Sequence, residues 1–92
     1  MVEYMTSNLA LASFLSMNGL AMARFFTDPT DEDTAFFVFN LTGPYEVDTM
    51  DRLVDLYERG AARVEPTRFL REVSTMRRQL YGYLESREAR AG

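Results

Sequence analysis

The sequence contains no cysteine, no histidine and no lysine, and each absence removes a class of chemistry. Without cysteine, the chain has neither a disulfide framework nor a thiolate metal site. Without histidine, it lacks the commonest general base and metal ligand. Without lysine, Schiff-base catalysis is excluded. All ten basic residues are therefore arginine, and Asp and Glu are the main candidates left for acid–base work.

Familiar catalytic and metal-binding motifs are also missing. Nucleophilic triads, thiol catalysis and P-loops all need residues that this sequence does not supply at the required spacing. The segment DPTDED at 28–33 holds four carboxylates, but it lacks the glycine and the D-x-D-x-D-G ladder of a calcium loop. We interpret it as a solvated hairpin turn. The sequence thus predicts a protein that is not an enzyme, with no catalytic residue, no cofactor and no metal.

No stretch has the composition of a membrane span. Residues 4–23 are uncharged, yet threonine, serine, asparagine and glycine recur through them, which hydrocarbon would not tolerate. The same stretch is a poor signal peptide, because the preceding residues are net negative where a positive region is required. We therefore expect no membrane association, and with no cysteine present we expect a cytoplasmic location.

Large apolar side chains are abundant, at 47% hydrophobic and 13% aromatic residues. A chain of 92 residues is one domain. Its most apolar short run is AFFVFNL at 35–41, which is typical of a buried strand. A domain of this size buries only about 60 to 65% of its unfolded surface, so stabilisation by self-association is one expectation.

The remaining elements follow from caps and periodicity. Asn18-Gly19 is a typical end of a helix, Asp48 and Asp51 resemble a capping box, and Pro66 suits a first helical turn. The predicted fold is α+β, a three-stranded, mostly antiparallel sheet with three helices packed largely on one face. The expected strands are 2–5, 20–27 and 35–41, and the expected helices are 7–18, 48–59 and 66–85. Residues 1–86 would form the domain and residues 87–92 a frayed tail.

Charge is distributed unevenly along the chain. Residues 1–58 hold ten acids and two arginines, a net charge of minus 8, whereas residues 59–92 hold eight arginines and four glutamates, a net of plus 4. Acidic and basic faces of this kind suit contact with a partner. The candidate partner-binding residues are Asp48, Asp51, Asp55 and Glu58 on the second helix, and Arg71, Arg77, Arg78, Tyr81, Tyr83 and Leu84 on the third. Two alternatives stay open: the arginines pair with the acidic helix, and the aromatic residues complete the core.

The segments YMTSNLALASFL with Gly19, FFVF, LVDLYERG, Phe69 and RRQLY together resemble a family of small uncharacterised domains from bacteriophages and prophages. The resemblance spans most of the chain. It implies a compact α+β accessory domain, located in the host cell cytoplasm, and it implies no catalytic residue.

The function that the sequence predicts is non-catalytic protein binding, with a second copy in a homodimer or with a host macromolecular complex. By analogy of size and charge, a phage-type inhibitor similar to anti-CRISPR proteins is the sharper form of this hypothesis. The alternative is a nucleic-acid-associated protein that uses the arginine-bearing last helix. A pI near 4.7 argues against that alternative.

Overall fold

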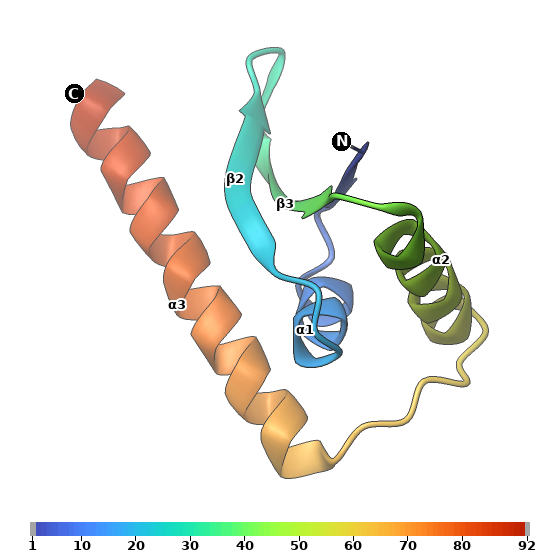
Figure 1. Cartoon of the computed structure of the whole chain (residues 1–92). Coiled ribbons are helices and arrows are strands. Elements are labelled where there is room, and N and C mark those ends of the chain that lie inside the picture. The colour runs from blue at the N-terminus through green and yellow to red at the C-terminus, as the bar shows by residue number, and fades with distance from the viewer. Residues whose placement is uncertain (1, 92) are drawn as a thin grey trace.

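The computed structural model describes residues 2–91, and the side chains of residues 32 and 89–91 are outside that description. It is an α+β fold of three strands and three helices, as predicted (Figure 1). In chain order the elements are β1 (Val2–Thr6), α1 (Leu9–Met17), β2 (Met22–Asp28), β3 (Asp31–Leu41), α2 (Pro44–Glu58) and α3 (Pro66–Ala91).

The sheet has the order β1-β3-β2, and both pairings are antiparallel. The predicted buried strand is therefore the central one, with a hydrogen-bonded neighbour on each side. Phe39 of β3 pairs with Tyr4 of β1 and Met22 of β2, and all three pack in the core. Strand β1 forms one edge of the sheet and β2 the other.

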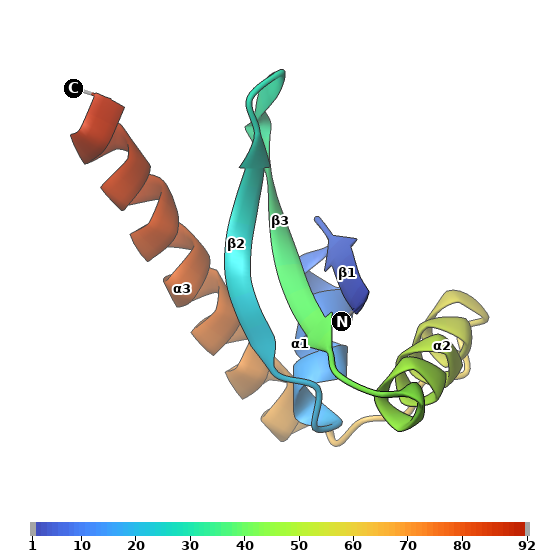
Figure 2. The same cartoon turned by 45° about the horizontal axis from the view of Figure 1, so that its top comes forward.

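The helices lie largely on one face of the sheet, as predicted. Figure 2 shows α1 and α3 behind β2 and β3, with α2 beyond the end of β3. The core combines one face of β3 with side chains from all three helices. Its most buried members include Phe37 and Phe39 from β3, Leu15 from α1, Met50 from α2 and Met76 from α3.

Helix α1 is nearly the predicted one, and its ends have clear causes. The side chain of Asn8 accepts a hydrogen bond from the backbone N of Leu11 at 3.1 Å, so Asn8 is the N-cap and the helix begins at Leu9. The helix ends at Met17 with Asn18 as its C-cap, and Gly19 follows with a φ of 95°. Glycine adopts that left-handed conformation without a steric penalty.

The predicted capping box at Asp48 and Asp51 is wrong, because α2 begins one turn earlier, at Pro44. Proline fits a first helical position because it has no N–H to leave unpaired and its φ is already helical. Glu46 accepts hydrogen bonds from the backbone N and the hydroxyl of Thr42, at 2.7 and 3.1 Å. The N-cap of α2 is Gly43, which makes no side-chain capping bond, and Glu46 instead ties the preceding Thr42 to the first turn of the helix.

The link between β2 and β3 is shorter than the long loop that we predicted. Asp28 pairs with Asp31 across a turn at Pro29 and Thr30, so β3 begins at residue 31 and not at 35. The carboxylate of Asp28 accepts hydrogen bonds from the backbone N and hydroxyl of Thr30, at 2.8 and 2.7 Å. An aspartate bonding two residues onward stabilises a tight turn, and the acidic segment is part of the hairpin.

Strand β2 contains an irregularity that the alternating pattern does not reveal. Met22 pairs with Phe39, but Arg24 pairs with Val38, so an extra residue is inserted at Ala23. A bulge of this kind reverses the side on which later residues lie. Met22 and Phe25 consequently both pack toward the core, whereas strict alternation along the expected strand 20–27 would place them on opposite sides.

The face of the sheet away from α1 and α3 is partly covered by one ion pair. Arg24 of β2 and Glu3 of β1 meet at 2.9 Å, although β3 lies between their strands. Neighbouring strands are about 4.8 Å apart, so the two side chains must reach across β3. Val38, which pairs with Arg24 and with Met5, is fully buried on this face.

Helix α3 begins at Pro66, as predicted, and continues to Ala91, beyond the predicted end at residue 85. Residues 86–91 include alanine, arginine and glutamate, which favour helix. Residues 87–91 continue this helix, and residues 1 and 92 lie outside the described residues. The fraying of residues 87–92 stays a prediction.

Glu65 caps the start of α3, which gives a pH-dependent prediction. Its carboxylate accepts hydrogen bonds from the backbone N of Arg68 and of Thr67, at 2.7 and 3.0 Å, and these bonds hold the pKa of Glu65 below its usual 4.5. A carboxyl group with a lowered pKa in the folded state stabilises the fold above its unfolded pKa. This contribution should disappear as the pH falls from 4.5 through the folded-state value.

Urea unfolding of the Glu65→Gln variant over a pH series measures this effect. We expect the variant to be less stable than the parent near neutral pH, and the difference to shrink once the pH is well below 4.5. Glu85→Gln changes an exposed acid farther along α3 and is the matched control. A Glu65→Gln difference that stays constant with pH would contradict the capping role of the charge.

Candidate functional site

The four acidic residues predicted on the second helix share one flank of α2. Asp48, Asp51, Asp55 and Glu58 recur at intervals of three and four, which places them on one side of a helix, and all are exposed. Asp55 pairs with Arg59 at 2.9 Å. In the described part of the chain no ion pair joins the other three to a basic side chain. We call these four residues the acidic flank.

The six residues predicted on α3 divide between solvent and core. Four are exposed and two are partly buried: Arg71, Arg77, Arg78 and Tyr81 outside, Tyr83 and Leu84 partly inside. The hydroxyl of Tyr83 lies 2.7 Å from the hydroxyl of Thr27 in β2. Its ring stacks on Phe25 with centroids 5.1 Å apart. Tyr83 therefore holds α3 against β2 and is not free for a partner.

The acidic flank and the arginines of α3 are not brought together. Figure 1 shows α1 between α2 and α3, and α1 makes contacts with both. Among the described residues, ion pairs join Arg24 to Glu3 and Arg59 to Asp55, and neither pair includes Arg71, Arg77 or Arg78. The alternative that the arginines pair with the acidic helix is therefore not observed for Arg71, Arg77 and Arg78, and the acidic flank lies apart from them.

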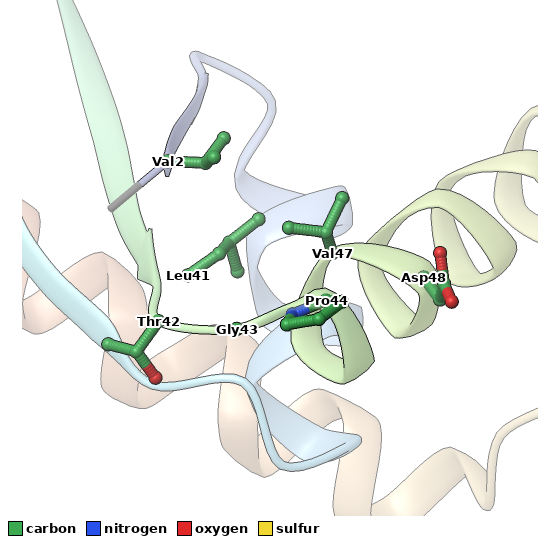
Figure 3. Close-up of a pocket in the computed structure, with 7 residues that line it drawn as sticks. All are labelled: Val2, Leu41, Thr42, Gly43, Pro44, Val47 and Asp48. Carbon is green, nitrogen blue, oxygen red and sulfur yellow. The ribbon is translucent and has the colours of Figure 1, made fainter.

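One residue of the acidic flank borders a pocket. A space of about 380 Å³ opens between the start of β1, the end of β3 and the first turns of α2. Its lining residues, drawn in Figure 3, are Val2, Leu41, Thr42, Gly43, Pro44, Val47 and Asp48. The side chains of Val2, Leu41 and Val47 extend toward one another, so the lining is mainly apolar (Figure 3). We call this the β1–α2 pocket.

Strand β1, which supplies one wall of this pocket, has a free edge. It pairs with β3 on one side, and no described strand pairs with it on the other. Alternate backbone N–H and C=O groups of an edge strand point outward without a strand partner. Val2, at the pocket, exposes 52% of its surface, and Met5 exposes 48%. The edge therefore combines backbone hydrogen-bonding groups with exposed apolar side chains.

Helix α2 runs beside β1 beyond the pocket itself. The side-chain amide of Asn8, just after β1, donates a hydrogen bond to the hydroxyl of Tyr57 at 3.4 Å. Burial, and next to it the negative charge of Glu58, raise the pKa of Tyr4 above 10.0. The charge of Glu58 thus acts on a side chain of β1. The start of β1 lies at the first turns of α2, and Asn8, two residues after β1, lies at the last turn.

Arg71 borders a second, smaller pocket. A space of about 290 Å³ is lined by Ser16 and Met17 of α1 and by Arg68, Arg71 and Glu72 of α3. The carboxylate of Glu72 accepts a hydrogen bond from the hydroxyl of Ser16 at 2.8 Å, so this pocket already contains a bonded acid. It places one candidate residue, Arg71, beside α1.

Sequence reasoning missed most of the β1–α2 pocket. Asp48 was a candidate, but Val2, Leu41, Pro44 and Val47 were assigned only to elements and turns. The available signals were the short alternating strand at the start and the Gly-Pro pair. Neither indicated that β1 is an edge strand or that α2 lies beside it, since both facts depend on how distant segments pack.

Further comparisons add no assignment. Over the described residues, no group of three or more acidic side chains could hold a metal ion. None of the helices in that part of the chain is both long enough and apolar enough to span a bilayer. Searches with protein-family models, curated proteins and solved structures found no match to this chain.

Proposed function

We propose that the chain is a non-catalytic protein-binding module and that the β1–α2 pocket is its binding site. The observation that supports this most is the free edge of β1 beside an apolar pocket and an acidic helix flank. Strand edges and apolar depressions are the features through which small domains hold other chains. An acidic rim adds selectivity and speeds encounter with a basic partner.

Site-specific photo-cross-linking in extracts of the source cell tests this proposal. A photoreactive residue replaces Tyr45, which is 80% exposed and lies next to Pro44 of the pocket. The matched position is Leu70 on α3, which is 64% exposed. We expect a discrete protein adduct from position 45 that is lost when Val47 is changed to Asp. Absence of adducts at position 45, or equal adducts at both positions, would contradict the proposal.

The partner is either a different protein or a second copy of this chain. Light scattering coupled to size exclusion at tens of micromolar decides between these. A mass of 10.6 kDa would exclude the homodimer, and twice that mass would support it. The finer hypothesis, an inhibitor of a host macromolecular complex of the phage accessory type, rests on resemblance, size and charge.

Nucleic-acid binding by α3 is the second candidate function. The observation in its favour is that Arg71, Arg77 and Arg78 are exposed and that no ion pair joins them to an acidic side chain in the described residues. The net charge of minus 4 opposes it. We expect no retention on duplex DNA at physiological salt. Strong retention that is lost in Arg71→Ala with Arg78→Ala would establish this function instead.

A further inference from the structure

We propose that the partner presents an extended basic segment, which adds as a fourth strand to the free edge of β1 and places an aliphatic side chain in the β1–α2 pocket. This inference rests on the proposed function and names the chemistry of the partner. Its components are backbone pairing along β1, one apolar anchor, and arginine or lysine side chains directed at the acidic flank.

Backbone pairing follows from the sheet order. Strand β1 spans five residues, about 17 Å at the usual rise of a strand, and pairs with β3 on one side only. An added strand of similar length would satisfy the outward N–H and C=O groups of β1. The described chain supplies no such strand, so in this proposal the partner supplies it.

The size and lining of the pocket determine the anchor. A volume of about 380 Å³ is at the lower end of ligand pockets, so it suits one or two side chains and not a whole cofactor. Val2, Leu41 and Val47 line it with aliphatic surface. Side chains of a strand alternate between faces, so every second residue of the added segment would point toward the pocket. The intervening residues would lie beside exposed Met5 on the other face.

The negative charge of α2 indicates which residues of the partner should lie on either side of its apolar anchor. Asp48, Asp51 and Glu58 have no ion-pair partner in the described residues, and Glu58 acts electrostatically on Tyr4 of β1. A basic segment on the edge of β1 would supply the missing counter-charges. A homodimer through β1 is disfavoured, because two-fold symmetry would bring two acidic flanks toward each other.

Selection from a library of random peptides long enough to span β1 tests the inference, with affinity then measured by fluorescence anisotropy. We expect selected peptides to share an aliphatic residue with arginine or lysine within two positions. N-methylation of alternate peptide amides should weaken binding about tenfold or more, and N-methylation of the intervening amides should not, because only one set faces β1.

Variants of the protein separate the contributions. Val47→Asp should abolish binding, whereas Leu70→Asp on α3 should not. Asp51→Asn with Glu58→Gln should weaken binding about tenfold and reduce its salt dependence, and this pair keeps binding testable if Val47→Asp fails to fold. Asp33→Asn with Glu85→Gln removes two exposed acids elsewhere and should leave the affinity unchanged.

The outcomes are distinguishable from those of the proposed function. A library that gives no binder, binders without basic residues, or affinity that is insensitive to N-methylation would overturn the extended basic segment. If position 45 still cross-links to a protein in a manner that requires Val47, the pocket remains a protein-binding site for a folded surface. If both experiments fail, the pocket is not a binding site.

Discussion

Phe39→Ala is expected to lower the free energy of unfolding by about 3 to 5 kcal/mol, the usual cost of truncating a buried phenylalanine. Phe39 is fully buried at the centre of the sheet, between Tyr4 of β1 and Met22 of β2. Truncation removes packing from both edge strands at once and leaves a cavity that a central strand cannot easily close. Small domains have a total stability of about 5 to 15 kcal/mol, so much of the fold's stability would be lost.

Urea unfolding followed by circular dichroism measures this change. Leu70→Ala is the control, because Leu70 is also large and apolar but exposes 64% of its surface on α3. Its effect should stay within about 0.5 kcal/mol. Equal losses in the two variants would mean that the core is not centred on β3.

Tyr83→Ala is expected to lower the free energy of unfolding by about 2 to 3 kcal/mol. The variant should destabilise the second half of α3 more than the first half. Tyr83 stacks on Phe25 and lies in hydrogen-bond distance of Thr27, and both partners belong to β2. The first half of α3 packs in the core through residues such as Met76, which is almost fully buried. Loss of Tyr83 would therefore loosen the end of the helix while its beginning stays in place.

Amide hydrogen exchange resolves this regional effect. In Tyr83→Ala, protection should fall over residues after Leu80 more than over those around Met76. Tyr83→Phe keeps the ring and removes only the hydroxyl, so we expect it to lower the free energy of unfolding by about 1 kcal/mol. Tyr81→Ala is the matched control, because Tyr81 is 57% exposed on the same helix. Uniform loss of protection along α3 in Tyr83→Ala would contradict an anchoring role.

Several elements could be read from the sequence because their causes are local. The seven residues at 35–41 are almost all apolar, which is typical of a buried strand, and Phe37, Val38 and Phe39 within it are almost fully buried. Asn18-Gly19 marks the end of α1 through contacts within four residues, whereas the start of the helix was predicted at residue 7 and lies at Leu9. Pro66 begins α3 for the same kind of reason.

The wrong predictions also have local explanations. Pro44 follows the predicted strand 35–41 and is the first residue of α2; proline suits both the break after a strand and the first turn of a helix, so its type alone does not place the start of the helix. The aspartates of α2 then seemed to be caps, although they lie within the helix. The bulge at Ala23 left no trace in the composition of β2, so the sides of Met22 and Phe25 could not be assigned correctly.

The candidate site was only partly predictable. Exposure of the acidic flank followed from its spacing, and that prediction agrees with the structure. Helical spacing places Tyr83, seven residues after the buried Met76, on nearly the same side of α3 as Met76, and places Tyr81 about 140° around the helix from it, but spacing does not identify the residues that Tyr83 contacts. Their difference arises from Phe25 and Thr27, which contact only Tyr83.

The sequence by itself determined the six elements, the apolar central strand, the uneven charge and the absence of cysteine, histidine and lysine chemistry. Only the tertiary structure decided that β1 is an edge strand, that α2 lies beside it, and that α1 separates the acidic flank from the arginines of α3. The physical reason is the separation along the sequence over which each interaction acts. Caps and helical periodicity depend on residues about four positions apart, whereas Val2 and Val47 line the same pocket only because the core has packed.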